Sequence, residues 1–203
     1  MPRGSSQRGF TMLELMMTIS VIMVMAVLAV PSVMDSMKRQ AAMDTARAVA
    51  DASELSRVQA AATGLAYELR VTVGAGLNNS GTVEVWQGTS SACNYFMAPN
   101  PTTGESARLI RTVDVTHDFP TTMIVSTVPA NLHISPICFK PDGRVFQVLG
   151  DLNPVIIPAV AGSDYHAGEA LIRLQRMDST GSLEGPVHVV RIPFNGLASV
   201  GLE

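Results

Sequence analysis

The sequence predicts an α+β protein in which a long N-terminal α-helix packs on a C-terminal antiparallel β-sheet or β-sandwich head. Three observations predict this class: an apolar run at 10–30, helix-favouring residues that continue to Ala62, and short strand patterns with turn signals from Leu65 onward. A chain of 203 residues has room for one domain and an appendage. We expect three parts, namely a short leader (1–9), a helix (10–63, spanning a membrane at 10–30) and a β-rich head (64–203).

The apolar run Phe10–Val30 predicts a membrane-spanning helix. It has 21 residues and one charged side chain, Glu14. At 1.5 Å per residue such a helix is about 31 Å long, close to the hydrocarbon thickness of a bilayer. Arg3 and Arg8 precede the run, and the positive-inside rule keeps a basic leader in the cytoplasm. The head is therefore expected outside the cytoplasm.

An ordinary secretory signal peptide is the alternative for this segment. Such a peptide has a shorter apolar stretch, followed by a cleavage site between small residues. Here the run is longer, and the best downstream site, Val30-Pro31-Ser32, is poor. Glu14 also lies inside the start of the run, where a carboxylate is costly unless it has a partner. These features favour a helix that stays attached to the protein and uses Glu14 for a function.

The segment RGFTMLEL (residues 8–15) resembles the type IV prepilin, or class III, signal. The resemblance implies that a prepilin peptidase cuts between Gly9 and Phe10 and that Phe10 is then N-methylated. It also implies that Glu14 is an assembly carboxylate, which pairs with the Phe10 ammonium of a neighbouring subunit. Pro31 falls where pilins commonly carry proline, and it predicts a kink or local unwinding of the helix.

The same resemblance implies partners and a location. The partners are prepilin peptidase, other pilin or pseudopilin subunits, and an inner-membrane assembly platform with a separate cytoplasmic ATPase. The chain itself has no P-loop motif. We expect a single-pass inner-membrane protein with its head in the periplasm, which later enters a fibre. The sequence does not separate a type IV pilus from a type II secretion pseudopilus, or a major from a minor subunit.

The segment Ser36–Ala62 is predicted to continue the helix, and Gly64 is predicted to end it. One face is expected to pack on the head while the other is solvated. The apolar residues that approximate this face are Met43, Ala46, Ala50, Leu55, Val58 and Ala62.

The head is predicted to consist of short strands with irregular connections. Gly74–Gly76 and Asn78–Gly81 are expected to be flexible, Gln87–Glu105 a long polar loop, and Gly150–Gly168 irregular. Lys140–Gly143 and Asp178–Gly181 are turn signals. The expected strands are Leu65–Val73, Thr82–Gln87, Ala107–Val115, Met123–Val128, Leu132–Phe139, Val145–Leu149, Ala170–Met177 and Val187–Ile192.

The segment ICFKPDGR (137–144) looks like a hairpin of the GspH/FimT family of minor pilins and minor pseudopilins. This second resemblance implies a β-sandwich head and a structural subunit. The alternative reading is a generic Pro-Asp-Gly turn, which occurs in many β proteins.

The chain has two cysteines, Cys93 and Cys138, both in the part expected outside the cytoplasm. A disulfide is reasonable in that compartment. Two separately buried thiols are the alternative. Their spacing does not suggest a structural zinc site.

No catalytic set, metal motif or cofactor fingerprint is visible, and we expect neither an enzyme nor a cofactor. The four histidines are scattered, and a solvated loop is favoured over a metal site at 164–169. A DNA- or surface-binding tip pilin is the alternative function. Some FimT-type minor pilins are associated with DNA capture through basic residues near the C-terminus. In this chain Arg191 is the one arginine or lysine within residues 180–203, which argues against DNA binding. Nucleic-acid binding would need Arg173, Arg176 and Arg191 to converge.

Overall fold

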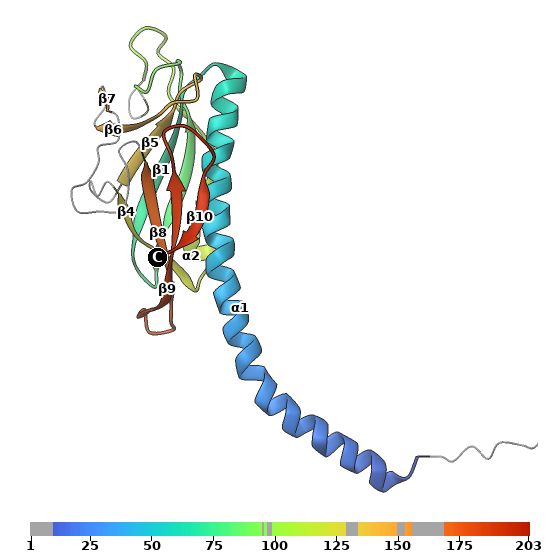
Figure 1. Cartoon of the computed structure of the whole chain (residues 1–203). Helices are drawn as coiled ribbons and strands as arrows, with labels where there is room; N and C mark the ends of the chain where they lie inside the picture. The colour runs from blue at the N-terminus through green and yellow to red at the C-terminus, as the bar shows by residue number, and fades with distance from the viewer. Residues whose placement is uncertain (1–9, 95, 97–98, 129–133, 150–152, 156–168) are drawn as a thin grey trace, which may run out of the picture. The chain divides into compact units, whose positions relative to one another are not determined.

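The computed structural model describes residues 10–94, 96, 99–128, 134–149, 153–155 and 169–203. It separates into two compact units, Met1–Arg39 and Gln40–Glu203, which are described one at a time. We call the second the head unit. It contains the second half of the long helix and all the described strands (Figure 1).

The helix α1 extends from Met12 to Thr63, within two residues of its predicted start. The helix continues through Pro31, although proline lacks the N–H of one helical hydrogen bond, so the kink stays a prediction. Gly64 ends the helix as expected. Its φ of 71° lies in the left-handed region that glycine adopts at low cost, and its N–H donates to the Ala60 carbonyl at 3.0 Å.

Within the head unit, the buried side of α1 differs from the predicted face. Ala46 is buried as expected, but Met43 and Val58 are 41% and 61% exposed. The reason is that small residues let the helix approach the sheets closely, and their weak hydrophobicity does not stand out in a sequence. Buried hydroxyls on this side bond to carbonyls of their own helix, which removes the cost of burying them. The buried positions are Ala42, Thr45, Ala46, Val49, Ala52, Ser53, Ser56 and Ala60.

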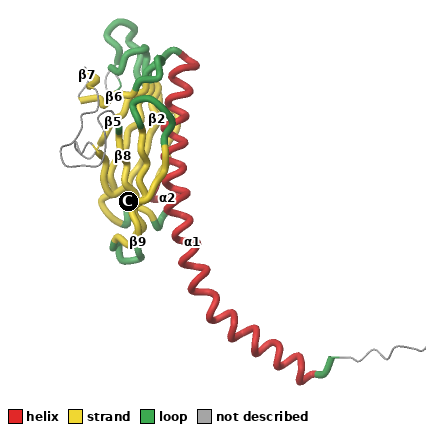
Figure 2. Tube along the Cα trace, viewed as in Figure 1, coloured by secondary structure: helices red, strands yellow, loops and turns green. Residues whose placement is uncertain are grey.

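Among the described residues, ten strands form two antiparallel sheets (Figures 1 and 2). The six-stranded sheet has the order β3-β2-β1-β5-β6-β7, and the four-stranded sheet the order β10-β9-β8-β4. The predicted combination of a long helix with an antiparallel β head is confirmed. The strands are β1 Tyr67–Gly76, β2 Asn79–Gln87, β3 Arg108–Asp114, β4 Thr122–Val128, β5 Ile134–Phe139, β6 Val145–Leu149, β7 Asn153–Val155, β8 Ala170–Met177, β9 Leu183–Ile192 and β10 Ser199–Leu202.

The first hairpin is tighter than the sequence suggested. Gly74–Gly76 belong to β1, and β2 already begins at Asn79, so the turn is only Leu77-Asn78. A Cβ on Gly74 would lie 2.7 Å from the Ser80 backbone, so this glycine permits a close approach of two strands. The prediction of a flexible connection was wrong because glycine in a strand and glycine in a turn look alike in a sequence.

Three further elements were not predicted. The short helix α2, Val115–Asp118, follows β3 and is capped by the Asp114 carboxylate, which accepts from the Thr116 and His117 N–H groups. The strand β7 lies inside the stretch predicted to be irregular. The strand β10 is only four residues long and directs a single apolar side chain, Val200, towards the core. Such short segments carry too few residues for a recognisable alternation.

The core of the head unit lies where the inner faces of both sheets meet the buried side of α1. Leu69 and Val85 come from the six-stranded sheet, Ile172 and Val190 from the four-stranded sheet, and Val49 from α1. A single continuous core of this kind is what stabilises a domain of this size.

Polar contacts also attach α1 to both sheets. Arg57 donates to the Gly143 carbonyl at 3.0 Å, in the β5–β6 turn, and to the Pro193 carbonyl at 3.1 Å, just after β9. Its guanidinium lies 5.7 Å from the centre of the Phe139 ring. One turn earlier, the Glu54 carboxylate accepts from the Ala198 N–H, just before β10. Burial lowers the pKa of Arg57, which remains charged at any physiological pH.

A disulfide joins Cys93 to Cys138, with an S–S distance of 2.06 Å. Cys138 lies on β5, and Cys93 lies in the predicted long loop between β2 and β3. The two cysteines form a small buried cluster with Ala66 and Phe96. The disulfide therefore fastens this loop to the six-stranded sheet.

Candidate processing and assembly site

The residues that the sequence nominated for processing lie at the start of α1. Gly9 falls outside the described residues, so the Gly9–Phe10 bond is known from the sequence alone. Phe10 precedes the helix, and its side chain is 73% exposed. Among the described residues of the first unit, no side chain buries Phe10.

Thr11 and Glu14 exchange hydrogen bonds around the first turn of α1. The Thr11 N–H and hydroxyl donate to Oε2 of Glu14, at 3.3 and 3.2 Å, and the Glu14 N–H donates to the Thr11 hydroxyl at 3.3 Å. This arrangement is a capping box, in which the residue before the helix and the third helical residue satisfy each other's free N–H groups. Glu14 also places a negative charge at the positive end of the helix dipole.

The capping role of Thr11 was missed in the sequence, although its signal was present. Thr11-Met12-Leu13-Glu14 fits the pattern of a threonine followed three residues later by a glutamate, directly before an apolar run. The resemblance to a prepilin signal implies that Glu14 pairs with a group from another subunit. In the single chain it already has two donors from Thr11.

The helical segment Met12–Val30 is long and apolar enough to cross a membrane, and its side chains are exposed in the single chain. Its few polar side chains are satisfied within the helix. The Thr18 hydroxyl donates to the Leu15 carbonyl and the Ser20 hydroxyl to the Met16 carbonyl, both at 2.8 Å. Hydroxyls bonded in this way are tolerated in hydrocarbon. The segment fits a membrane anchor for a soluble head.

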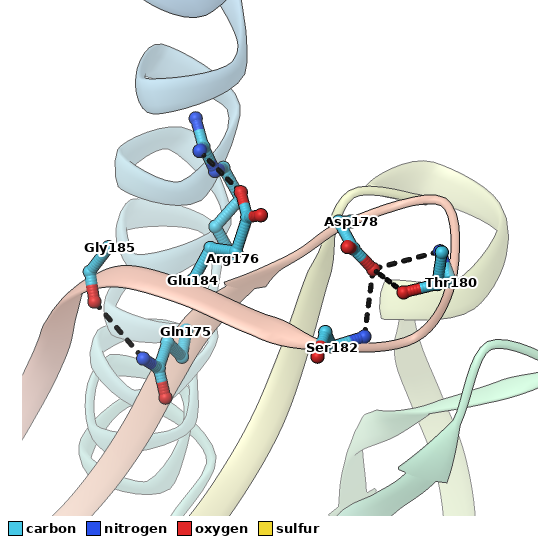
Figure 3. A network of polar contacts seen from close by, with 7 residues as sticks. All are labelled: Gln175, Arg176, Asp178, Thr180, Ser182, Glu184 and Gly185. Atoms are coloured by element: carbon cyan, nitrogen blue, oxygen red, sulfur yellow. Dashed lines mark hydrogen bonds and ion pairs between the residues drawn. The ribbon is translucent and has the colours of Figure 1, made fainter.

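The three arginines considered for nucleic-acid binding each have a carboxylate partner. Arg173 donates two hydrogen bonds to Glu203, at 2.6 and 2.8 Å, and the pair lowers the pKa of Glu203. Arg176 bonds to Glu184 at 2.8 Å, as Figure 3 shows. Arg191 lies 3.7 Å from Glu169. Each charge is thus balanced locally, and the arginines do not form a bare cationic patch.

The turn next to this pair is held by the Asp178 carboxylate. It accepts from the N–H groups of Thr180 and Ser182 and from the Thr180 hydroxyl, at 2.7 to 2.8 Å (Figure 3). These donors lower the pKa of Asp178. The predicted turn Asp178–Gly181 is present, and all the side chains of this network serve the hairpin itself.

The remaining candidates for metal chemistry do not converge. Among the described residues no group of three or more histidine, cysteine, aspartate or glutamate side chains could hold a metal ion. His117 is exposed on α2 and His188 is buried on β9. His133 and the stretch 164–168, with His166, lie outside the described residues.

Residues 4–30 match the family described as "Prokaryotic N-terminal methylation motif". The match includes Gly9, Phe10 and Glu14 and the apolar run, and it ends just before Pro31. No curated protein and no solved structure matches the chain. The N-terminal segment therefore carries a prepilin-type signal. This signal supports a pilin-type protein that prepilin peptidase processes and that assembles with other pilins.

Proposed function

We propose that this chain is a minor pilin or minor pseudopilin, a structural subunit of a type IV pilus or of a type II secretion pseudopilus. The single observation that carries the proposal is the prepilin-type signal at residues 4–30, whose apolar part, Met12–Val30, is an exposed helix. A secretory signal peptide alone would not join its apolar segment to the head through one uninterrupted helix, as α1 does here.

In this proposal, cleavage between Gly9 and Phe10 removes the basic leader and leaves α1 attached to the head. The new amino group of Phe10 is methylated. The Glu14 carboxylate of one subunit then neutralises the Phe10 ammonium of another. An unpaired charge in a low-dielectric environment costs roughly several kcal/mol. Subunits are therefore most stable in the register in which each Glu14 meets a Phe10 ammonium.

The head gives limited support to the GspH/FimT subfamily. The segment that suggested it forms the β5–β6 hairpin, in which the Lys140 N–H donates to the Arg144 carbonyl at 2.9 Å and Gly143 has a φ of 83°. A generic Pro-Asp-Gly turn would have the same geometry.

Counting the copies of the chain per fibre by quantitative mass spectrometry separates a minor subunit from a major one.

The direct test of the proposal is the Glu14→Ala variant. We expect it to be cleaved and inserted in the membrane as the parent chain is, and to be absent from sheared fibres because its assembly charge is gone. Glu105→Ala, which removes an exposed carboxylate of the head, is the matched control. N-terminal mass spectrometry should find Phe10 as the first residue. Normal incorporation of Glu14→Ala, or a mature chain that retains residues 1–9, contradicts the proposal.

A further inference from the structure

The strand β3 forms one end of the six-stranded sheet, and its only strand partner in the described part of the chain is β2. Among the described residues, no backbone hydrogen bond reaches its other side. Residues 108–112 are all exposed, including the apolar side chains Leu109 (43%) and Ile110 (40%). An edge strand with free N–H and C=O groups is a template on which another strand can form.

A bulge in β3 brings two arginines to the same face of the sheet. Arg108 is opposite Gln87 and Arg111 is opposite Val85, while Ile110 is the extra residue. Gln87 and Val85 are two residues apart on β2, so their partners lie on one face, about 7 Å from each other. Without the bulge, residues three apart would face opposite sides.

These two guanidiniums differ from the other arginines on the strands and turns. Arg70, Arg144, Arg173 and Arg176 each form a close ion pair with a carboxylate. In the described part of the chain, neither Arg108 nor Arg111 has an ion pair. The edge of β3 therefore carries two arginines that form no ion pair among the described residues, beside exposed apolar side chains, in a protein whose net charge is −3.

An open cleft of about 450 Å³ begins where β3 begins. Arg108 lines it together with Leu65, Gln87, Thr89, Glu105 and Ser106. The cleft therefore meets the edge strand at Arg108.

Arginines and bulges on an edge strand can also serve to keep other strands away. That explanation does not account for the exposed Leu109 and Ile110, nor for two arginines aligned on one face. We propose that the free edge of β3 binds an extended acidic segment of a partner protein, which adds as a strand and presents carboxylates two residues apart to Arg108 and Arg111. This proposal does not depend on the proposed function.

The test uses the full-length chain in detergent micelles and a fluorescent, end-blocked nine-residue peptide. The peptide alternates threonine and valine and carries two glutamates two positions apart. Anisotropy at low salt measures its binding. Control peptides carry the glutamates three positions apart, or lysines in their place. The variants are R108A/R111A and, as the matched control, R144A, which removes an exposed arginine from the β5–β6 turn.

We expect R108A/R111A to weaken binding about tenfold, as two exposed ion pairs allow, and R144A to leave it unchanged. We also expect both control peptides to bind more weakly. Bound peptide should slow the amide hydrogen exchange of residues 108–113. The proposal is overturned if the acidic peptide does not bind below 1 mM, on the order of weak peptide docking, or if R108A/R111A binds it equally well. If R108A/R111A self-associates and the parent chain does not bind the peptide, the arginines serve to keep other strands away. If the parent chain pairs with a second copy of itself through β3, the edge binds another subunit and not an acidic segment of a partner protein. Either outcome overturns the proposal.

Discussion

Glu14 takes part in two separate interactions, and single substitutions can distinguish them. Its carboxylate accepts from Thr11 in the capping box, and in the proposed fibre it neutralises an ammonium of another subunit. Glutamine at this position still serves a capping box but carries no charge. Threonine at position 11 contributes to the cap and carries no charge either. The cap and the assembly charge can therefore be removed one at a time.

We predict that Glu14→Gln keeps the first turn of α1 ordered but is lost from fibres, whereas Thr11→Ala does the reverse. Removing the Thr11 cap should destabilise the first turn by about 0.5–2 kcal/mol. Amide hydrogen exchange of residues 12–15 in micelles, together with immunoblots of sheared fibres, measures the two effects. Thr18→Ala is the control, because its hydroxyl only adds a bond to a carbonyl that the helix already uses. Equal fibre loss in Thr11→Ala and Glu14→Gln would argue against separate roles.

We expect His188 to make the stability of the head unit sensitive to mild acid. It is 8% exposed on β9, and its neighbours across the sheet are Leu174 and Leu202. Burial lowers the pKa of His188 below its usual value. Below about pH 6.5 the histidine binds a proton more readily in the unfolded chain than in the folded chain. The contribution of neutral His188 to the free energy of unfolding is therefore fully present above about pH 6.5 and decreases as the pH falls below it.

We predict that the midpoint of urea unfolding decreases between pH 7.5 and 5, and that His188→Gln flattens this dependence. His117→Gln, which changes an exposed histidine on α2, is the control variant. The carboxylates Asp142, Asp178 and Glu203 also have lowered pKa values, but their contribution is lost only below about pH 4.5. An unchanged slope in His188→Gln would assign the effect to another group.

At the scale of elements, the disulfide attaches the loop between β2 and β3 to β5. Among the described residues of this loop, Cys93 and Phe96 are the buried apolar side chains of the cluster around the disulfide. Cys93 and Cys138 are 45 residues apart, so their bond shortens a long segment of the unfolded chain. We predict that a Cys93→Ser/Cys138→Ser variant loses roughly 4 kcal/mol of unfolding free energy.

Urea unfolding of this variant and of the parent chain, each with and without reductant, measures the loss. The double variant should no longer respond to reductant, which makes it its own control. A parent chain whose stability does not change on reduction would mean that the loop is held by its noncovalent contacts.

The elements also show where sequence reasoning succeeds and where it fails. The hairpins at Lys140–Gly143 and Asp178–Gly181 could be predicted because the conformational preferences of their turn residues determine the backbone locally. The side of α1 that packs on the head could not, because Ala46 and Ser56 bury little apolar area and the larger Val58 points away. The strand β10 was beyond prediction because its pairing with β9 is decided by tertiary contacts.

At the scale of the whole molecule, the N-terminal signal was readable because its chemistry is local. Phe10, Glu14 and the apolar run can be recognised without knowing the fold. The order of the strands in two sheets could not be predicted, since β1 pairs with β5 across more than sixty residues and no short pattern encodes that choice. The same holds for the bulge in β3, which is visible only in the register with β2.

The core also predicts how the chain can be divided. Every residue of the main core lies between Ala46 and Val200, inside the head unit. We predict that a chain reduced to residues 40–203 folds cooperatively and stays soluble without detergent. Circular dichroism and a single unfolding transition in urea measure this, and a chain cut to residues 64–203, which lacks the buried side of α1, is the control and should fail to fold. A folded 64–203 chain would mean that the helix is dispensable to the core.

Arg57 has a mechanical consequence. Its guanidinium grips a carbonyl from the β5–β6 turn and another from the end of β9, so it touches both sheets at once. A pull along the helix axis is thus transmitted to both sheets at once. Glu54 fastens the segment before β10 one turn earlier, which spreads the load over a second anchor point.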